Sequence, residues 1–409
     1  MLREIKKPIR DHALRILQCL VAAIRPLSVE ELAEVLAVDF DDAGGVPKLK
    51  PNWRWEDQEQ ALLISCSNLI TIVDTGRSRV VQFSHFSVKE FLTSERLATS
   101  SQDVSRYHIA LNPAHTILAQ ACMSILLHVH DHDEQNDVEM NDPLALYAAE
   151  YWVHHAQFED VASQIKGMEY LFDADKPYFA AWCKLHDIDI FSPNSVFSSF
   201  PKLYRKSAGT PLYYAALCGF RNIVEQLIVK HPKDVRAISG YLMTPAVAAL
   251  AGRHFEVAQV LHRRGSSMNP QGSLGKFPLH CAVDFMDLEM IQVLVDHGAG
   301  VNVRNKRGST PLGYALRNHR SRRPANPGVV RWLLNHGADP NVRDEDGETS
   351  LHKALESGMI EIARILVEHG ASVKVEDRWG WTPLDYASGE ERDELIKLHH
   401  AKRENCYIM

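Results

Sequence analysis

The chain contains 409 residues, of which 45% are hydrophobic and 24% are charged, and its formal net charge is -7. These values are typical of globular proteins with two to four domains, and they exclude a protein that binds nucleic acid through its overall charge. No run of about 18 apolar residues, the length that a membrane span needs, is present. Seven scattered cysteines and a charged N-terminus without an apolar signal core predict free thiols in an intracellular, cytoplasmic protein.

Residues 1–108 have the order of a winged-helix domain, in which three helices precede a β-hairpin. Pro26 ends the first helix, and Ser28 and Glu31 have the spacing of a capping box that begins the second. Alternating apolar residues on both sides of a Thr-Gly-Arg-Ser turn predict the hairpin. The expected elements are helices over residues 11–23, 28–36, 57–68 and 87–94, and strands over residues 69–73 and 80–83.

The third of these helices argues against DNA recognition. Winged helices that bind DNA place arginine or lysine in the major groove, but this helix begins Trp55-Glu-Asp-Gln-Glu59 and contains no basic residue. Acidic and basic residues nearly balance over residues 1–110, 15 against 14. We therefore interpret the domain as a structural spacer without a nucleic-acid partner.

Residues 109–190 predict a block of helices. Tyr147, Trp152, Tyr170 and Trp182 lie at amphipathic spacing and are expected in its core. The sequence His128-Val-His-Asp-His-Asp133 has alternating histidines that could share a metal ion. The acidic residues that follow favour a polar linker instead, so we predict no metal or cofactor site. The expected helices cover residues 113–129, 143–158, 161–172 and 177–186.

The second half of the chain repeats one short phrase six times. It reads Thr-Pro-Leu-Tyr, Thr-Pro-Ala-Val, Phe-Pro-Leu-His, Thr-Pro-Leu-Gly, Thr-Ser-Leu-His and Thr-Pro-Leu-Asp, at steps of 34, 33, 33, 39 and 33 residues. Threonine is a good N-cap and proline suits the first helical position, while a His-Gly pair ends the second helix of several repeats. This period and phrase resemble ankyrin repeats. The phrases begin at Thr210, Thr244, Phe277, Thr310, Thr349 and Thr382.

Together these patterns predict a mainly α-helical chain. We expect about six repeats, starting near residues 207, 241, 274, 307, 346 and 379, stacked into a solenoid with polar end repeats. The expected divisions are a winged-helix domain over 1–108, a helical linker domain over 109–190, a linker over 191–203, ankyrin repeats over 204–400 and a C-terminal tail over 401–409.

The repeats predict a binding surface for a protein partner and no catalytic site. In ankyrin repeats the hairpin tips and the exposed positions of the first helix line the concave face. Arginine and aromatic residues, which dominate the energetics of protein interfaces, occupy several such positions here. The candidate protein-binding residues are Tyr214, Phe285, Arg304, Arg307, Tyr314, Arg343, Trp379 and Trp381.

Four segments of the first half resemble fungal NACHT-ankyrin proteins, which are NLR-like. Residues 25–36, 65–69 and 83–93 look like the winged-helix segment of that family, and residues 147–155 look like the helical segment that follows it. The resemblance implies a NACHT ATPase before residue 1, in which case the chain is a short form or an incomplete gene product. The sequence itself contains no P-loop, because its one Gly-Lys pair, Gly275-Lys276, precedes Phe277. It contains no Gly-x-Ser-x-Gly elbow either.

Two functions therefore remain open: a non-enzymatic binding scaffold, or the regulatory part of a NACHT-type signalling ATPase. A further candidate lies in the last four residues, Cys406-Tyr-Ile-Met409, which fit a C-a-a-X prenylation box with a preference for farnesyl. A single farnesyl chain would give only weak membrane association. An ordinary unmodified terminus is the alternative.

Overall fold

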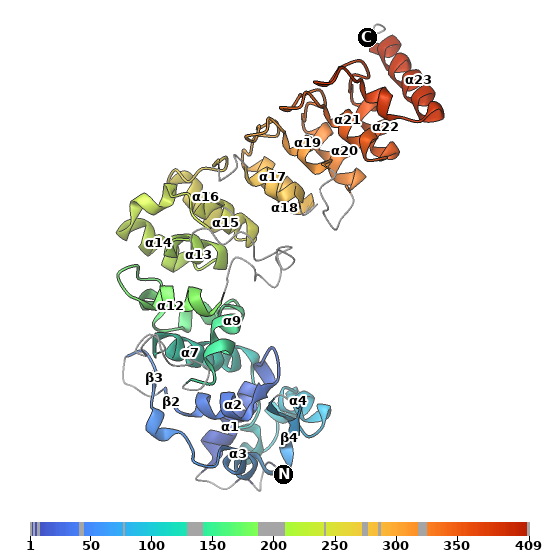
Figure 1. Cartoon of the computed structure of the whole chain (residues 1–409). Helices are drawn as coiled ribbons and strands as arrows, with labels where there is room; N and C mark the ends of the chain where they lie inside the picture. Colours follow the sequence, from blue (N-terminus) through green and yellow to red (C-terminus); the bar gives the residue numbers. More distant parts are fainter. Residues whose placement is uncertain are drawn as a thin grey trace. The chain divides into compact units, whose positions relative to one another are not determined.

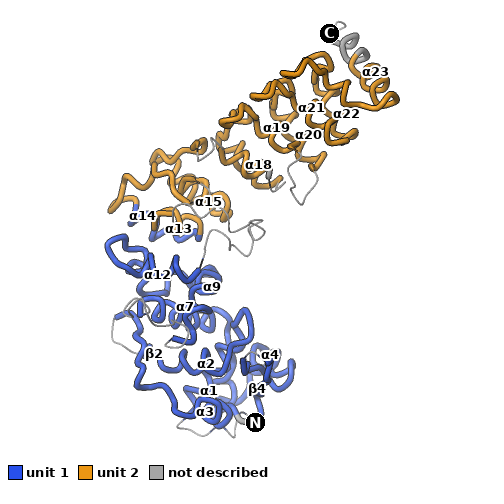
Figure 2. The backbone as a smooth tube through the Cα atoms, in the orientation of Figure 1, with its two compact units in different colours: residues 1–193, 218–227 blue, residues 194–217, 228–409 orange. Residues whose placement is uncertain are grey.

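The structure, a computed structural model, describes residues 2, 5, 9–40, 45–76, 78–128, 142–186, 209–240, 243–271, 277–284, 288–317 and 325–406. The chain is mainly helical and divides into two compact units, which Figure 2 colours separately. The first unit comprises residues 1–193 and 218–227, and the second comprises residues 194–217 and 228–409. The division therefore falls inside the first predicted repeat.

The first unit begins with the predicted winged helix (Figure 1). Ser28 and Glu31 form the expected capping box at the start of the second helix. The predicted hairpin is an antiparallel pair, β4 and β5, with Ile72 opposite Val81. A two-residue strand, β1, pairs with the other edge of β5. The elements are α1 (Arg10–Ala22), β1 (Leu27–Ser28), α2 (Val29–Leu36), α3 (Gln58–Cys66), η4 (Ser67–Leu69), β4 (Ile70–Asp74), β5 (Arg79–Phe83), α4 (Phe86–Leu92), α5 (Glu95–Ala98) and α6 (Gln102–Ser105).

The segment expected to be a loop after α2 contains its own small hairpin. Its strands are β2 (Val38–Asp39) and β3 (Lys48–Leu49), and a 3-10 turn, η3 (Pro51–Trp53), follows. Strands of two residues carry no readable alternation, so the sequence pattern could not indicate them. The hairpin contacts α7 (Leu111–His128), the longest helix of this unit's described residues.

The helical segment follows the prediction except at one point. Its helices are α7, α9 (Ala145–Ala156), α10 (Val161–Gln164), α11 (Met168–Leu171) and α12 (Tyr178–Leu185). The helix expected over residues 161–172 is interrupted at Gly167, whose φ of +98° lies in the left-handed region. The side chain of Gln120 stabilises the break, because its amide accepts from Lys166 N and donates to Lys166 O.

An aromatic cluster forms the core of this segment. Trp152 and Trp182 are completely or almost completely buried, and their ring centroids are 5.2 Å apart. Phe172 contacts both rings. Phe220, which follows the first repeat's phrase in sequence, stacks on Trp152 at 5.3 Å. Residues 218–227 belong to the first unit because Phe220 completes this cluster.

Two ionic groups join the winged helix to the helical segment. Arg25 forms an ion pair with Glu31, and its guanidinium lies 4.9 Å from the Tyr147 ring centroid. Arg54 binds the buried carboxylates of Glu34 and Asp142. Buried carboxylates are stable only when paired in this way, so Arg54 is required where α2 approaches the start of the α9 segment.

The second unit is a stack of helix pairs (Figure 1). Helices α17, α19, α21 and the 3-10 turn η11 contact one another in series and form an inner row, while α20, α22 and α23 form an outer row. The elements of the repeats are α13 (Pro211–Cys218), α14 (Arg221–Lys230, most of which belongs to the first unit), η9 (Pro232–Arg236), α15 (Pro245–Ala251), α16 (Phe255–Arg263), α17 (Pro278–Asp284), α18 (Leu288–Asp296), α19 (Pro311–Ala315), α20 (Pro327–Asn335), α21 (Ser350–Glu356), α22 (Ile360–Glu368), η11 (Pro383–Tyr386) and α23 (Gly389–Cys406).

The predicted cap chemistry is confirmed in these repeats. The hydroxyl of Thr244 accepts from Val247 N, and that of Thr310 accepts from Gly313 N. Gly298, Gly337 and Gly370 have positive φ at the ends of α18, α20 and α22, where left-handed residues are needed. The charged segment after Gly389, which lacks an apolar pattern, is nevertheless helical through Cys406.

A chain of buried polar groups crosses the first unit. Ile24 N donates to Tyr147 Oη, and Tyr147 Oη lies 2.9 Å from His155 Nε2. The Nδ1 atoms of His155 and His115 are 2.8 Å apart. If Tyr147 donates to Nε2, His155 donates from Nδ1 to His115, so the chain is satisfied with both imidazoles neutral. Burial lowers the pKa of His155 to about 3 and that of His115 to about 4, assisted by the neighbouring His154.

This arrangement predicts acid sensitivity of the first unit. The folded pKa of His155 lies below its ordinary value of 6.5, so the unfolded chain binds the proton more readily. The free energy of unfolding is therefore complete above about pH 6.5 and falls as the pH decreases toward 3, by about 2 kcal/mol at pH 5 for one such histidine. Urea unfolding at pH 7.5, 6 and 5, followed by the fluorescence of buried tryptophans, measures this loss.

Variants separate the histidine pair from general acid effects. His155→Asn should lower stability at pH 7.5 but flatten its dependence on pH. His108→Asn changes a partly exposed histidine of the same unit and should keep the full dependence. A pH dependence that is unchanged in His155→Asn contradicts the assignment.

Candidate protein-binding surface of the ankyrin hairpins

Three described hairpins of the second unit are each organised by one polar side chain, which is buried at Asn305 and Asp377 and half-buried at Asp344. Asn305 Oδ1 accepts from the backbone N–H of Arg307 and Ser309. In the next hairpin, Asp344 Oδ1 accepts from the backbone N–H of Asp346 and Glu348. In the one after it, Asp377 Oδ1 accepts from the backbone N–H of Trp379 and Trp381. The turn amides are thus satisfied by a side chain two residues before the tip, which is an Asx-type turn.

The second oxygen of each aspartate binds a residue of the following inner helix. Asp344 pairs with the buried Lys353, and Asp377 accepts from Tyr386 Oη at 2.9 Å. Burial and the bond to Asp377 raise the pKa of Tyr386 to about 12. Burial alone would raise the pKa of Asp377, but its bonds from Trp381, Tyr386 and Trp379 outweigh this and hold the pKa below the usual range.

A second set of side chains joins each repeat to the next one. Asn302 Nδ2 donates to Gly337 O at 2.8 Å, and Asn302 Oδ1 accepts from Asp339 N. Asn341 makes the same bridge to Gly370 O and Ser372 N. Our sequence reasoning missed these asparagines, although the recurring Asn-Val pair before each turn was a signal that could have found them. They fix the spacing between hairpins.

Two arginines expected to bind a partner are part of this framework. Arg304 donates from Nε to Gly308 O and from Nη2 to Arg343 O, 2.8 Å away. Arg343 repeats the pattern with Gly347 O and Glu376 O. Each guanidinium therefore links its own turn to the next hairpin. Two of the five N–H donors of each guanidinium are therefore used inside the chain, so these arginines have a framework role that the sequence did not indicate.

Trp379 and Trp381 differ from these arginines because the hairpin uses only their backbone. Their amides bind Asp377, and Trp381 O lies 3.2 Å from His352 Nε2. Their indoles remain 55% and 52% exposed. The guanidinium of Arg378 lies 4.2 Å from the Trp379 ring centroid, and the Trp381 ring contacts Tyr386. The indoles are thus oriented by neighbours but not covered.

The remaining candidates have different positions. Arg307 is exposed at a hairpin tip. Tyr314 is half-buried at the position that Lys353 and Tyr386 occupy in later repeats, and its ring contacts His280. Tyr214 is only 4% exposed, so the prediction that it offers a binding surface is wrong: its helix turns the ring into the core. Phe285 lies outside the described residues.

Metal ligation finds no support in the part of the chain that the structure describes, and several of its cysteines are buried. No group of three His, Cys, Asp or Glu side chains there could hold a metal ion. Most of the histidine-rich segment, residues 129–141, lies outside the described residues. Burial raises the pKa of Cys19 and Cys66 to about 12, and it also raises the pKa of Cys122 and Cys218, so these free thiols are poor nucleophiles. Among the same residues we find no helix with the length and apolar composition of a membrane span.

Comparison with protein families agrees with this architecture. A family model described as "Ankyrin repeats (3 copies)" matches residues 245–344 and 321–402. A second, described as "GPI inositol-deacylase, winged helix domain", matches residues 2–102. The second match concerns the winged helix alone, so it assigns a fold and not deacylase activity. Ankyrin repeats indicate a role in protein–protein interaction.

Similar proteins include several from fungi. "Azaphilone pigments biosynthesis cluster protein L" of Monascus ruber is 31% identical over 275 residues, which are 63% of this chain and 56% of that protein. "Probable 26S proteasome regulatory subunit p28" of Saccharomyces cerevisiae is 32% identical over 112 residues, 27% of this chain and 49% of that protein. "Ankyrin repeat protein nuc-2" of Neurospora crassa is 23% identical over 182 residues, 44% of this chain and 13% of that protein. The region that this chain matches covers 56% or less of the length of each of these relatives.

The asparagine bridges generate a stability prediction. Asn341→Ala removes the bonds to Gly370 O and from Ser372 N, which join two repeats. We expect the free energy of unfolding of the ankyrin unit to fall by about 1–2 kcal/mol, measured by urea denaturation with circular dichroism. Lys374→Ala, which shortens an exposed side chain of the next hairpin, is the control and should change stability by less than about 0.5 kcal/mol. Equal losses in the two variants contradict the bridging role.

Proposed function

We propose that the chain is a non-enzymatic scaffold that binds a protein partner through the concave face of its ankyrin repeats. The observation that carries the proposal is the pair of exposed indoles at Trp379 and Trp381, in a hairpin whose fold depends on their backbone atoms. Large rigid aromatic side chains lose little conformational entropy on binding, and tryptophan is enriched among interface hot spots. Exposed Arg307 extends the surface along the hairpins.

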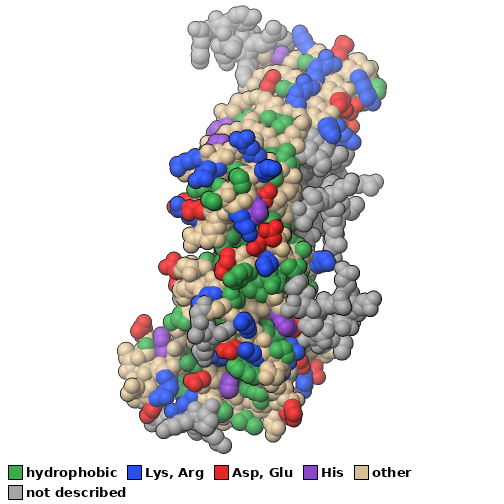
Figure 3. Space-filling view, turned by 90° about the vertical axis from the view of Figure 1, so that its left-hand side faces the viewer, with side chains coloured by type: hydrophobic (Ala, Val, Ile, Leu, Met, Phe, Trp, Pro, Cys, Tyr) green, Lys and Arg blue, Asp and Glu red, His purple; other side chains and the backbone are tan. Residues whose placement is uncertain are grey.

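The charge distribution favours a protein over a nucleic acid as partner. Figure 3 shows basic and acidic side chains interspersed on the visible face. Nucleic-acid binding depends on neutralising many phosphates, which interspersed acidic groups oppose. Buried free cysteines support placement of the scaffold in a reducing, intracellular setting. The identity of the partner follows from experiment.

The test removes the two indoles from the full-length protein. Affinity purification from the source cells identifies copurifying proteins, and binding of each purified partner is then measured by calorimetry. The double variant Trp379→Ala/Trp381→Ala should weaken binding by about 2 kcal/mol or more, which is roughly 30-fold. Its folding should be little changed, because the backbone bonds of the hairpin remain.

Trp53→Ala provides the matched control. Trp53 is 48% exposed, comparable to the hairpin indoles, but lies in the first unit. This variant should bind every partner as the wild type does. Unchanged binding in the double variant, for all partners of the wild type, would overturn the proposed surface.

The second candidate function is a regulatory segment of a NACHT-type signalling ATPase. The winged-helix match and the resemblance of residues 147–155 to that family support it. The two functions differ in what the same gene encodes ahead of this sequence. An in-frame P-loop upstream in the genome and transcript favours the ATPase, whereas a transcript that starts at Met1 favours the scaffold.

We also propose that Cys406 is farnesylated in a chain that ends at Met409. The support is the C-a-a-X spacing; the backbone is helical through Cys406, while its side chain and residues 407–409 lie outside the described part. Intact-mass measurement of protein expressed in a eukaryotic host should show the mass of a farnesyl group, absent in Cys406→Ser. An unmodified terminus that ends in Met409 excludes it.

A further inference from the structure

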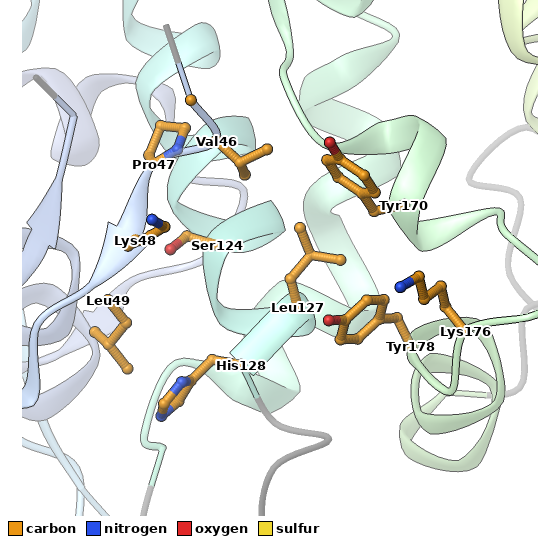
Figure 4. A pocket seen from close by; sticks show the side chains of 11 residues that line it. Val46, Pro47, Lys48, Leu49, Ser124, Leu127, His128, Tyr170, Lys176 and Tyr178 are labelled. Atoms are coloured by element: carbon orange, nitrogen blue, oxygen red, sulfur yellow. The ribbon is translucent and has the colours of Figure 1, made fainter. Parts of the chain in front are cut away.

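A cavity of about 540 Å³ lies within the first unit, at the end of α7. The β2–β3 hairpin forms one wall, and α11 with the segment that begins α12 forms the other. Figure 4 shows Lys48 and Ser124 on one side and Tyr170, Lys176 and Tyr178 on the other. Its volume is within the range of pockets that bind small molecules.

The lining combines an apolar wall with hydrogen-bond donors. Val46, Pro47 and Leu127 supply apolar surface. Two lysines, two tyrosines, one serine and one histidine supply polar groups, and no carboxylate is found among the described residues that line the cavity. These are Gly45, Val46, Pro47, Lys48, Leu49, Ser124, Leu127, His128, Tyr170, Lys176 and Tyr178. Asp173 and Asp175 precede Lys176 in the chain but are not part of the lining. The cavity therefore favours a ligand that carries negative charge.

Ser124 is the group that points most directly to a ligand. It is 3% exposed, and its hydroxyl has no hydrogen-bond partner among the described residues. Leaving a buried hydroxyl unpaired destabilises the folded state. A buried, unpaired serine at this position of α7 is explained if a bound molecule accepts a hydrogen bond from its hydroxyl.

The wall opposite Ser124 depends on a close backbone approach. Gly167 has φ +98°, and a Cβ at this position would lie 2.9 Å from Val46 Cγ1 and 3.0 Å from Leu127 Cδ1. A side chain there would push apart the two residues that form the apolar wall. The start of α11, the helix that carries Tyr170, is therefore held against the hairpin by a conformation that only glycine adopts readily.

From these features we propose that the cavity binds a small organic anion, an apolar body that carries a phosphate or carboxylate group. The apolar body contacts Val46, Pro47 and Leu127. Ser124 donates a hydrogen bond to the bound molecule from one side of the cavity, and Tyr170 and Lys176 face its anionic group from the other. This site is separate from the ankyrin hairpins and does not depend on the function proposed for them.

The experiment measures binding of simple probes to the full-length protein by calorimetry at low ionic strength. Phenyl phosphate and benzoate test the two anionic groups, benzyl alcohol tests the apolar body without charge, and inorganic phosphate tests the charge without an apolar body. We expect saturable binding of phenyl phosphate or benzoate, at least ten-fold tighter than that of benzyl alcohol or inorganic phosphate. Whichever anion binds tighter identifies the headgroup.

Three variants assign the binding to this cavity. Lys176→Met and Ser124→Ala should each weaken the tighter probe about five-fold or more. Lys166→Met removes an exposed lysine that does not line the cavity, and it should leave the affinity unchanged. Ser124→Ala should also raise the unfolding midpoint of the free protein, because it removes an unpaired buried hydroxyl.

Ser124→Ala is thus expected to raise the unfolding midpoint and to weaken ligand binding. These opposite effects distinguish a ligand-binding serine from a structural one. A Ser124→Ala variant that lowers the midpoint overturns the role of Ser124. No saturable binding of either organic anion, equal affinity for benzyl alcohol or inorganic phosphate, or equal losses in Lys176→Met and Lys166→Met overturns the site.

Discussion

The ankyrin unit depends on satisfying the backbone amides of its hairpins. A hairpin that projects from a helix stack has few neighbours, so its turn amides need side-chain acceptors. Asn305, Asp344 and Asp377 fill this need at equivalent positions. Because each turn is held in the same conformation, the asparagine bridges and the arginines can repeat from one hairpin to the next. The geometry of the hairpins follows from these side-chain acceptors.

The first unit depends on a different feature, the contacts that join its winged helix to its helical segment. Its winged helix and helical segment share buried ionic groups at Arg25 and Arg54 and the polar chain through Tyr147. Such groups add little net stability over apolar packing, but they require one specific arrangement. Phe220 then brings the beginning of the repeats into the aromatic cluster around Trp152. The first repeat is therefore atypical because part of it serves as core for another unit.

Sequence reasoning predicted the features that depend on local pattern. Helix periodicity, the threonine caps and the glycines that end the outer helices were readable because each depends on a few neighbouring residues. Features that depend on contacts distant in sequence were not readable. The burial of Tyr214, the pairing of β1 with β5 and the use of Arg304 and Arg343 inside the framework are of this kind. The sequence of a hairpin does not show whether its arginine binds a partner protein or a backbone carbonyl of the same chain.

Buried polar atoms therefore help to separate framework from function in this chain. Where a polar side chain is fully bonded, as Asp377 is, its role is structural. Tyr107 and Trp152 also have buried polar atoms without a partner, but their large rings gain enough from burial to offset one unpaired atom. Ser124 has no apolar body to provide such compensation, and it lines a cavity. The same physical cost thus has a packing explanation at the rings, whereas at Ser124 it supports the ligand that we propose for the cavity.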